Sequence, residues 1–255
     1  MRRTDSKGYW DNRAKSYSEV NQEELVGVQR NTWKDLLEEQ ISSAFGDKDR
    51  SQIRILDIGA GPGFLSIVLA ELGYTVTAAD YSVEMMTEAK KNAESCEVSI
   101  RFVRENAMDL SFREGCYDVV ISRNLIWNLE NPKKAYQEWL RVLKPSGMLL
   151  VFDANWYTYL RDENSRKAYD RDRENVSKSG FEDYNIGENF DQMEEIANHL
   201  PMTDVSRPQW DKEVLLTMGI EGVETVLDIG SRVYSEKEKV NYRSTPMFMI
   251  KAMKG

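Results

Sequence analysis

The chain has 255 residues, 41% of them apolar, which is enough to bury one substantial core with an added cap. A formal net charge of −9 provides no general basic face for phosphates and disfavours nucleic acid as a partner. Cys96 and Cys116 are too few for a disulfide framework or a multi-cysteine zinc site. The start, MRRTDSKGYW, contains no signal segment, and no apolar run approaches the roughly 18 residues of a membrane span. We therefore expect a cytoplasmic protein without a membrane partner.

Helices and strands are predicted to alternate from the start of the core. Apolar residues at helical spacing predict an amphipathic helix over residues 23–45. The apolar run at residues 53–58 predicts the first strand, which ends at a cluster of glycines. A helix then begins near Gly63, and a strand at residues 75–79 completes a β-α-β unit.

The alternation continues toward the middle of the chain. Asn131 followed by Pro132 is a helix start signal, because Asn caps the first turn and Pro fits its first position. The continuously apolar run at residues 148–152 predicts a central strand covered on both faces. Between these elements and the first unit we expect a helix over residues 83–93 and strands over residues 98–103 and 117–122. Five strands with intervening helices indicate a doubly wound α/β sheet.

The pattern changes after the fifth strand. Residues 158–200 are densely charged and lack a sustained buried stripe until their end, so they predict an inserted helical cap. A helix over residues 210–218 and two closing strands, at residues 223–233 and 246–252, are expected next. A second VLDIG, residues 226–230, is followed by no further glycine and is assigned to the sixth strand. The predicted fold is a Rossmann-like, seven-stranded, mostly parallel sheet with an antiparallel last strand and a helical cap after strand 5.

The segment ILDIGAGPGF, residues 55–64, carries the clearest chemical signal. Gly59, Gly61 and Gly63 allow the backbone to approach a ligand closely. The helix that begins at Gly63 presents free N–H groups, which favour a carboxylate or phosphate. Asp80, at the end of the second strand, is placed to accept hydrogen bonds from a ribose diol. Together these features predict a site for an adenosine ligand with an anionic end.

The glycine spacing separates two kinds of adenosine ligand. A dinucleotide motif, GxGxxG, would place its third glycine at position 64, where this chain has Phe64. The spacing here is GxGxG. Asp57 lies two residues before the first glycine, where its carboxylate can engage an ammonium group directly or through water. S-adenosylmethionine supplies such an ammonium in its amino-acid part. The alternative for the whole glycine motif is a tight turn that binds no ligand.

These motifs resemble those of the class I S-adenosylmethionine-dependent methyltransferases, especially the small-molecule group with the ubiquinone and menaquinone C-methyltransferases. The resemblance covers about residues 9–157: ILDIGAGPG matches the first motif, AADYSVEMM the second, and LKPSGMLLVFD the segment entering the fifth strand. YWDNRAKSY, residues 9–17, looks like the family's N-terminal lid. The chain departs from the family at Glu105, Asn106 and Ala107, where Gly-Asp-Ala is common, and at Ser146, which replaces a glycine.

The resemblance and the motif together imply a set of cofactor-binding residues. Tyr81 and Met85 would lie against the adenosine, and Asn106 with Ala107 would border the adenine edge, where a contact to the amino group must use the Asn carbonyl oxygen. The complete expected set is Trp10, Tyr17, Asp57, Gly59, Ala60, Gly61, Gly63, Asp80, Tyr81, Met85, Asn106, Ala107 and Arg123.

The methyl acceptor is expected at the carboxyl ends of the fourth and fifth strands, where ligands bind in an open sheet. Its candidate contacts are Asn124, Trp127, Asn155, Trp156 and Tyr157. Packing under the cap is the alternative for the aromatic residues, and capping a turn is the alternative for the two amides. His199, the single histidine, is a candidate general base or a helix-end residue. Arg207 is expected to anchor the last helix rather than close the pocket.

The predicted function is methyl transfer to a small-molecule metabolite, with S-adenosylhomocysteine as product and no metal. The sulfonium methyl is already activated, so the protein needs only to hold donor and acceptor in line and exclude water. The sequence leaves open whether oxygen, nitrogen, sulfur or carbon is methylated, and whether the protein is a monomer or a homodimer. A nicotinamide-dependent oxidoreductase and a catalytically silent S-adenosylmethionine-binding regulator are the alternatives.

The expected organisation is one structural domain with four parts. They are an N-terminal helical lid, an S-adenosylmethionine-binding core, an inserted cap over the substrate site and a C-terminal completion of the sheet, at residues 1–46, 47–157, 158–205 and 206–255.

Overall fold

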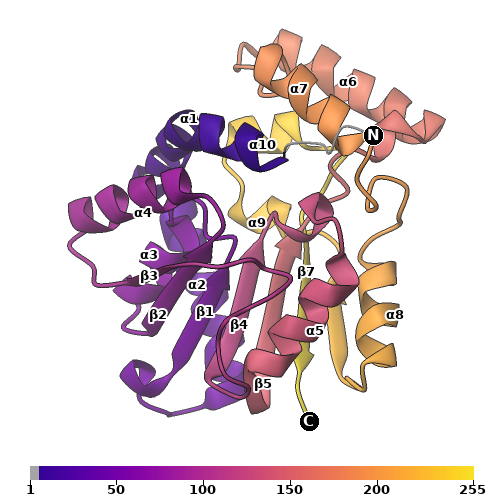
Figure 1. The fold of residues 1–255 in the computed structure, drawn as a ribbon. Coiled ribbons are helices and arrows are strands. Elements are labelled where there is room, and N and C mark those ends of the chain that lie inside the picture. The colour runs from indigo at the N-terminus through magenta and orange to yellow at the C-terminus, as the bar shows by residue number, and fades with distance from the viewer. Residues whose placement is uncertain (1–5) are drawn as a thin grey trace.

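A seven-stranded sheet forms the centre of the protein, which the computed structural model describes over residues 6–255 (Figure 1). The strand order is β3-β2-β1-β4-β5-β7-β6. Neighbours from β3 to β5 are parallel, whereas β7 is antiparallel to both β5 and β6. The strands are β1 (Arg54–Ile58), β2 (Thr75–Asp80), β3 (Arg101–Arg104), β4 (Tyr117–Arg123), β5 (Leu143–Asp153), β6 (Val223–Val226) and β7 (Phe248–Met253). The predicted Rossmann-like sheet with an antiparallel last strand is confirmed.

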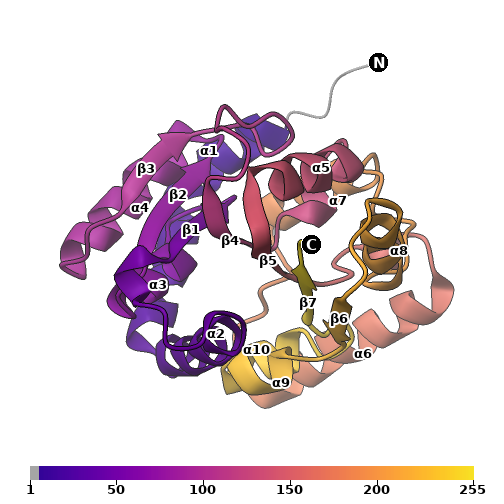
Figure 2. The ribbon, with the colours of Figure 1, turned by 90° about the horizontal axis from the view of Figure 1, so that it is seen from below.

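Helices cover both faces of this sheet, and each face has its own apolar core (Figure 2). Neighbouring residues of β1 alternate between them: Ile55 packs toward α2 and α3, and Leu56 packs toward α5. The helices are α1 (Ser6–Val26), α2 (Gln29–Phe45), α3 (Phe64–Glu71), α4 (Val83–Ser95), α5 (Pro132–Val142), α6 (Glu163–Ser179), α7 (Glu188–Ala197), α8 (Gln209–Thr217), α9 (Gly230–Val233) and α10 (Glu236–Asn241).

The start of α5 follows from its sequence. The side chain of Asn131 accepts a hydrogen bond from the N–H of Lys134 at 3.0 Å, and Pro132 occupies the first helical position. Tyr136 and Trp139 on its inner face are fully buried against the sheet. The predicted cap and helix are confirmed.

The prediction of one helix over residues 23–45 is wrong, because the chain bends at Gly27 between α1 and α2. A Cβ at Gly27 would lie 2.9 Å from the carbonyl oxygen of Glu23 and 2.4 Å from the side chain of Gln29. Glycine therefore permits a bend that a side chain would obstruct. As a result α1 is a separate helix that lies across the core.

Several strand boundaries also differ from those predicted, and the differences at β3 and β6 have a local cause. β3 begins at Arg101 rather than at residue 98, because the N–H of Val98 still bonds to the carbonyl of Ala93 in the end of α4. The strand predicted over residues 223–233 ends at Val226. Asp228 then accepts a hydrogen bond from the N–H of Ser231 at 3.0 Å in the turn before α9, so the second VLDIG is not a continuous strand.

Four helices, α1, α6, α7 and α10, lie above the carboxyl ends of the parallel strands in Figure 1. The region between β5 and α8 contributes α6 and α7, and the connection between β6 and β7 contributes α10. No helix within residues 6–255 is long and apolar enough to cross a membrane. The fold thus gathers its added helices over the sheet edge at which doubly wound proteins bind ligands.

Candidate cofactor and acceptor site

The turn between β1 and α3 depends on three glycines. Gly59, Gly61 and Gly63 have φ values of 68°, 53° and 94°, a region that side chains other than glycine rarely adopt. A Cβ at Gly59 would lie 2.7 Å from Leu125, and one at Gly63 would lie 3.2 Å from the Cβ of Ala89. The sequence motif is therefore a backbone requirement of this turn.

Asp80 closes the same turn from the neighbouring strand. Its Oδ2 accepts a hydrogen bond from the N–H of Gly61 at 2.9 Å, and its Oδ1 accepts one from the N–H of Ser82 at 2.8 Å. Burial raises the pKa of Asp80, and these backbone donors oppose that shift. Each carboxylate oxygen keeps a further lone pair, so the group can still accept from ribose hydroxyls.

Asp57 lies below the glycine turn and is only 2% exposed. Its Oδ2 accepts a hydrogen bond from the hydroxyl of Ser66 at 2.6 Å. Burial raises the pKa of Asp57 from 3.8 to about 6, while the bond from Ser66 and the charge of Arg123 act in the opposite direction. The carboxylate is thus mostly ionised at neutral pH and is available to an ammonium group.

Helix α1 lies directly on the glycine turn. A Cβ at Gly61 would come within 3.7 Å of the Tyr17 ring, and the Trp10 ring packs edge-on against Tyr17 with centroids 5.7 Å apart. The N–H of Phe64, in the first turn of α3, donates to the side-chain oxygen of Asn21 at 3.3 Å. The structure therefore brings Trp10 and Tyr17 to the predicted cofactor site. Asn21 accepts one of the N–H groups at the start of α3 that were predicted to bind a ligand.

Arg123 is held by this same helix. Its guanidinium donates two hydrogen bonds of 2.9 Å to the carboxylate of Glu24, and it lies 4.8 Å above the ring of Phe64. Glu24 is buried and bonds in addition to Asn21. Arg123 thus contacts α1, which the sequence did not predict, because nothing local in the chain links residues so far apart.

The predicted adenine side is more open. Tyr81 is 48% exposed, and the Arg104 guanidinium lies 5.0 Å from its ring centroid, whereas Met85 is buried beneath. The side-chain oxygen of Asn106 accepts a hydrogen bond from the N–H of Met108 at 3.0 Å. That oxygen already shapes a turn, so it gives little support to the predicted contact with the adenine amino group.

Next to Asn106, the carbonyl of Ala107 is also engaged. It accepts a hydrogen bond from the indole N–H of Trp139 on α5, at 3.0 Å. Ala107 therefore contributes to holding the loop after β3 against the core. The remaining member of the glycine turn, Ala60, donates its N–H to the carbonyl of Ala79 at 3.1 Å and so fixes the turn to β2.

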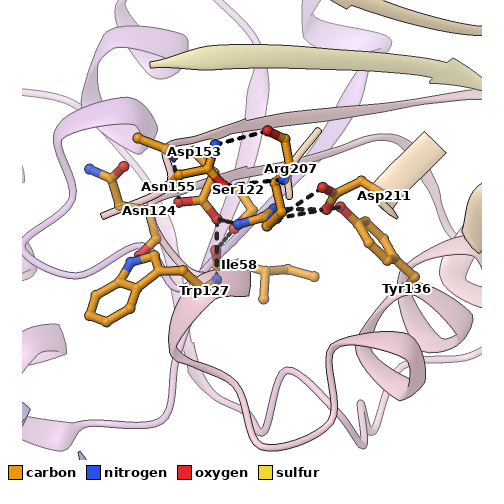
Figure 3. Close-up of polar contacts among 10 residues, drawn as sticks. Ile58, Ser122, Asn124, Trp127, Tyr136, Asp153, Asn155, Arg207 and Asp211 are labelled. Carbon is orange, nitrogen blue, oxygen red and sulfur yellow. Dashed lines mark hydrogen bonds and ion pairs between the residues drawn. The ribbon is translucent and has the colours of Figure 1, made fainter. Parts of the chain in front are cut away.

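Asn124 follows β4 immediately and adopts an uncommon backbone conformation, with φ of 57°. Its carbonyl oxygen accepts the indole N–H of Trp127 at 2.9 Å (Figure 3). Its side-chain oxygen is buried and has no hydrogen-bond partner within the described chain. Because buried polar atoms are nearly always paired, this oxygen is a candidate contact for a ligand.

Asn155 has a different surrounding from Asn124. Its side chain donates to the carbonyl of Arg207 at 2.8 Å and accepts from the N–H of Arg207 at 3.1 Å. Both the oxygen and the nitrogen of the amide are therefore bonded to the backbone of Arg207. This agrees with the alternative that Asn155 caps a turn. Asn155 still lines a small pocket together with Trp127, Trp156 and Tyr157, as predicted for acceptor contacts.

The pocket walls are aromatic and lie close to a larger cavity. The rings of Trp127 and Tyr157 pack with centroids 5.1 Å apart, and the Trp156 ring contacts Tyr242 at 5.2 Å. The indole N–H of Trp156 is buried without a partner among residues 6–255. A cavity of about 570 Å³ beside the cap shares Asn155 with this pocket, along with Thr158 and Thr203.

A buried charge network supports these strand ends and was not predicted from the sequence (Figure 3). Arg207 contacts Asp153 at 2.5 Å and Asp211 at 2.8 Å, and Tyr136 donates to Asp211 at 2.6 Å. Asp153 also accepts the N–H of Trp127 at 3.3 Å. Arg207 therefore anchors α8 through Asp211, as expected. A charged residue directly after an apolar strand and an acid four residues after Arg207 were the available signals.

His199 lies apart from this network. It is exposed at the end of α7, where its Nδ1 is 2.9 Å from the carbonyl oxygen of Glu195. This is the surrounding of a helix-end residue, and it gives no support to the role of general base.

The family model described as a methyltransferase domain matches residues 56–151. A ubiquinone/menaquinone biosynthesis C-methyltransferase of Roseobacter denitrificans is 30% identical over 167 residues, 64% of this chain and 63% of that protein. The chain thus spans just under two thirds of that relative's length.

Two solved structures share the fold. A Methanococcus maripaludis protein described as an S-adenosylmethionine-dependent methyltransferase has a TM-score of 0.61 and 21% identity, covering 100% of this chain and 97% of its own. Phosphoethanolamine N-methyltransferase 2 of Haemonchus contortus, solved with S-adenosylhomocysteine, has a TM-score of 0.57 and 16% identity, covering 86% and 53%. Residues 56–151 thus match a methyltransferase domain, and the strand order of the sheet gives the chain the fold of these solved methyltransferases.

Proposed function

We propose that this protein transfers the methyl group of S-adenosylmethionine to a small-molecule metabolite. The observation that carries the proposal is the turn of three glycines between β1 and α3, flanked by the carboxylates of Asp57 and Asp80. In this proposal Asp57 binds the ammonium of the cofactor's amino-acid tail and Asp80 binds the hydroxyls of its ribose. The family match and the fold support this assignment.

The remaining cofactor contacts are proposed from the same geometry. Trp10 and Tyr17 on α1 cover the turn, and the indole N–H of Trp10, buried and unpaired within residues 6–255, is free to bond to a ligand. Tyr81 and Met85 are proposed to contact the adenosine, since they follow Asp80 at the end of β2. When bound, the cofactor supplies a methyl group on a positively charged sulfur, which needs no further activation.

The chain's own contribution is to orient the acceptor and exclude water. Trp127, Trp156 and Tyr157 provide aromatic walls, and Asn155 fixes the turn that follows β5. Holding two reactants in a reactive arrangement lowers a barrier by about 7 to 11 kcal/mol. The relative from Roseobacter denitrificans is named a C-methyltransferase of quinone biosynthesis, and a small organic acceptor is proposed here by analogy.

The proposal is tested by calorimetry followed by a labelled transfer assay. We expect the purified chain to bind S-adenosylmethionine more tightly than NAD, and to release S-adenosylhomocysteine when incubated with a metabolite extract and methyl-labelled cofactor. Tighter binding of NAD would favour an oxidoreductase instead. Binding without any transfer would favour a silent regulator.

Asp57 predicts how cofactor affinity depends on pH. Its raised pKa of about 6 means that the carboxylate is largely ionised at pH 7 and largely protonated at pH 5. Since only the ionised form attracts the ammonium group, we expect affinity to fall about tenfold between these pH values. Calorimetry at constant ionic strength measures this, and in Asp57→Asn the ratio of the two affinities should be close to one. Equal affinities of the parent protein for S-adenosylmethionine at pH 7 and pH 5 would contradict the assignment of Asp57 to the ammonium group.

A further inference from the structure

We propose that the acceptor is an amine and that the side-chain oxygen of Asn124 holds its reacting nitrogen. This inference rests on the proposed function, because it concerns the acceptor side of the same site. It narrows the four acceptor atoms left open by the sequence to one.

Asn124 lies where three parts of the site meet. The next residue, Leu125, packs so closely on the glycine turn that a Cβ at Gly59 would approach it to 2.7 Å. Tyr17 on α1 forms a side-chain hydrogen bond with Asn124 that lowers the pKa of Tyr17, which is the effect of an amide N–H donor, and Trp127 donates its indole N–H to the Asn124 carbonyl. Asn124 therefore lies between the glycine turn, which Leu125 contacts, and two aromatic side chains, Tyr17 of α1 and Trp127 of the proposed acceptor pocket.

The side chain of Asn124 lacks one hydrogen bond. Its oxygen is buried and unpaired among the described residues, on a residue whose φ of 57° is already uncommon for a residue with a side chain. A carbonyl oxygen of this kind accepts N–H or O–H groups and repels anions. The missing partner is thus a neutral or cationic donor, which excludes a phenolate, a thiolate and a carboxylate as the group facing it.

The described residues next to Asn124 do not provide a base that would remove a proton from a hydroxyl or carbon acid. Both oxygens of Asp153 are occupied, by the N–H of Ala154 and by Arg207 with Trp127. Burial raises the pKa of Tyr157 well above its usual value and also raises the pKa of Tyr17, so both phenols stay protonated. An alcohol, phenol or carbon acceptor would need such a base, whereas a neutral amine carries both a lone pair and an N–H.

The transfer step then balances without a protein base. The amine loses its ammonium proton to water before it binds, and the neutral amine donates an N–H to the Asn124 oxygen while its lone pair forms the new bond to the methyl carbon. The bond between sulfur and that carbon breaks, and its electron pair stays on sulfur, which becomes neutral. The nitrogen product carries the positive charge and loses one proton to water after it leaves. Asn124 is accordingly a positioning group that touches the substrate, not a base.

The rest of the acceptor has space in the cavity of about 570 Å³ that adjoins the aromatic pocket. Its lining is rich in hydroxyl groups, including those of Thr158, Thr203, Ser206 and Ser244. Such a surface suits a polar substituent better than a hydrocarbon chain, because a hydrocarbon would leave these groups without partners. The expected acceptor is therefore a polar small molecule that ends in a primary or secondary amine.

The test uses three variants of the full-length chain. Asn124→Gly removes the side chain but tolerates the positive φ, and Asn124→Asp keeps an acceptor oxygen. Glu97→Gly is the matched control, since Glu97 has a φ of 55° and lies exposed after α4, away from the site. Each protein receives S-adenosylmethionine with a carbon-13 methyl group, a bacterial metabolite extract and a panel of primary, secondary and aromatic amines. Proton–carbon NMR identifies the atom that carries the label.

We expect the label on nitrogen. For Asn124→Gly we expect a fall in kcat/KM of at least about 30-fold, a fall of less than about fivefold for Asn124→Asp and none for Glu97→Gly. Calorimetry provides a readout besides activity: the amine that is methylated should bind the complex with S-adenosylhomocysteine at least about tenfold more weakly in Asn124→Gly, while affinity for S-adenosylmethionine stays within about twofold.

Two results would overturn the inference and leave the proposed function intact: a label on oxygen, sulfur or carbon, or equal activity of Asn124→Gly and Glu97→Gly. In both cases cofactor binding and methyl transfer by the parent protein would still stand on their own measurements. Failure of the proposed function is recognised separately, as absence of S-adenosylmethionine binding before any acceptor is added or as binding without any labelled product, and it would overturn the inference as well.

Discussion

Replacing Asp80 with alanine is expected to weaken the binding of S-adenosylmethionine by about a hundredfold or more. In the proposed complex this carboxylate accepts hydrogen bonds from the two ribose hydroxyls, and a hydrogen bond to a charged group contributes about 1.5 to 3 kcal/mol. Two such bonds exceed the roughly 2.7 kcal/mol that corresponds to a hundredfold change in affinity. The substitution also removes the acceptors of the Gly61 and Ser82 N–H groups, which shape the turn.

Calorimetry measures the loss, and thermal unfolding separates it from damage to the turn. Asp80→Asn keeps one acceptor oxygen and is expected to lose affinity less than Asp80→Ala. Asp47→Ala, at an exposed position before β1, is the control and should bind as the parent protein does. Unchanged affinity in Asp80→Ala, with a normal unfolding transition, would refute the assignment of the ribose site.

The features that the sequence predicts well are local. The glycine turn is encoded by residues within one short segment, and each of its glycines is required by a positive φ. Asp80 follows an apolar strand directly, so its place at the strand end could be predicted from periodicity alone. The cap of α5 at Asn131 is likewise a matter of adjacent residues. For these elements the expected and observed positions agree.

The features that the sequence did not predict depend on contacts between distant segments. Glu24 and Arg123 are 99 residues apart, and only the folded chain brings α1 to the end of β4. Asn21 similarly reaches the first turn of α3 across 43 residues. In residues 223–233, the turn at Asp228 prevailed over a strong β pattern, because the Asp228 side chain offered the backbone N–H of Ser231 another partner.

The cofactor half of the site was therefore more predictable than the acceptor half. A bound nucleoside is recognised largely by backbone geometry, which a short motif specifies. The acceptor walls come from separate connections, after β4 and after β5, and their arrangement depends on the buried pair between Asp153 and Arg207. Asn124 and Trp127 could be predicted as candidate acceptor contacts because they follow β4, but only the folded structure shows that the side-chain oxygen of Asn124 lacks a partner within residues 6–255.

Replacing Arg207 with methionine is expected to lower the free energy of unfolding by about 3 to 5 kcal/mol. The guanidinium is almost completely buried between the carboxylates of Asp153 and Asp211, whose side chains are fully buried. Methionine fills much of the same volume but leaves two negative charges without a partner, and removing one member of a buried ion pair costs this much. Urea unfolding followed by circular dichroism measures the change.

Two further variants separate the charge effect from the loss of packing. Arg232→Met removes a guanidinium that is 41% exposed and paired with Glu39, so we expect a loss below about 1 kcal/mol. Adding Asp153→Asn and Asp211→Asn to Arg207→Met removes the uncompensated charges and should restore much of the lost stability. If the triple variant is no more stable than Arg207→Met, packing rather than charge holds the ends of β4 and β5 against α8. The acceptor wall would then depend on the shape of the Arg207 side chain alone.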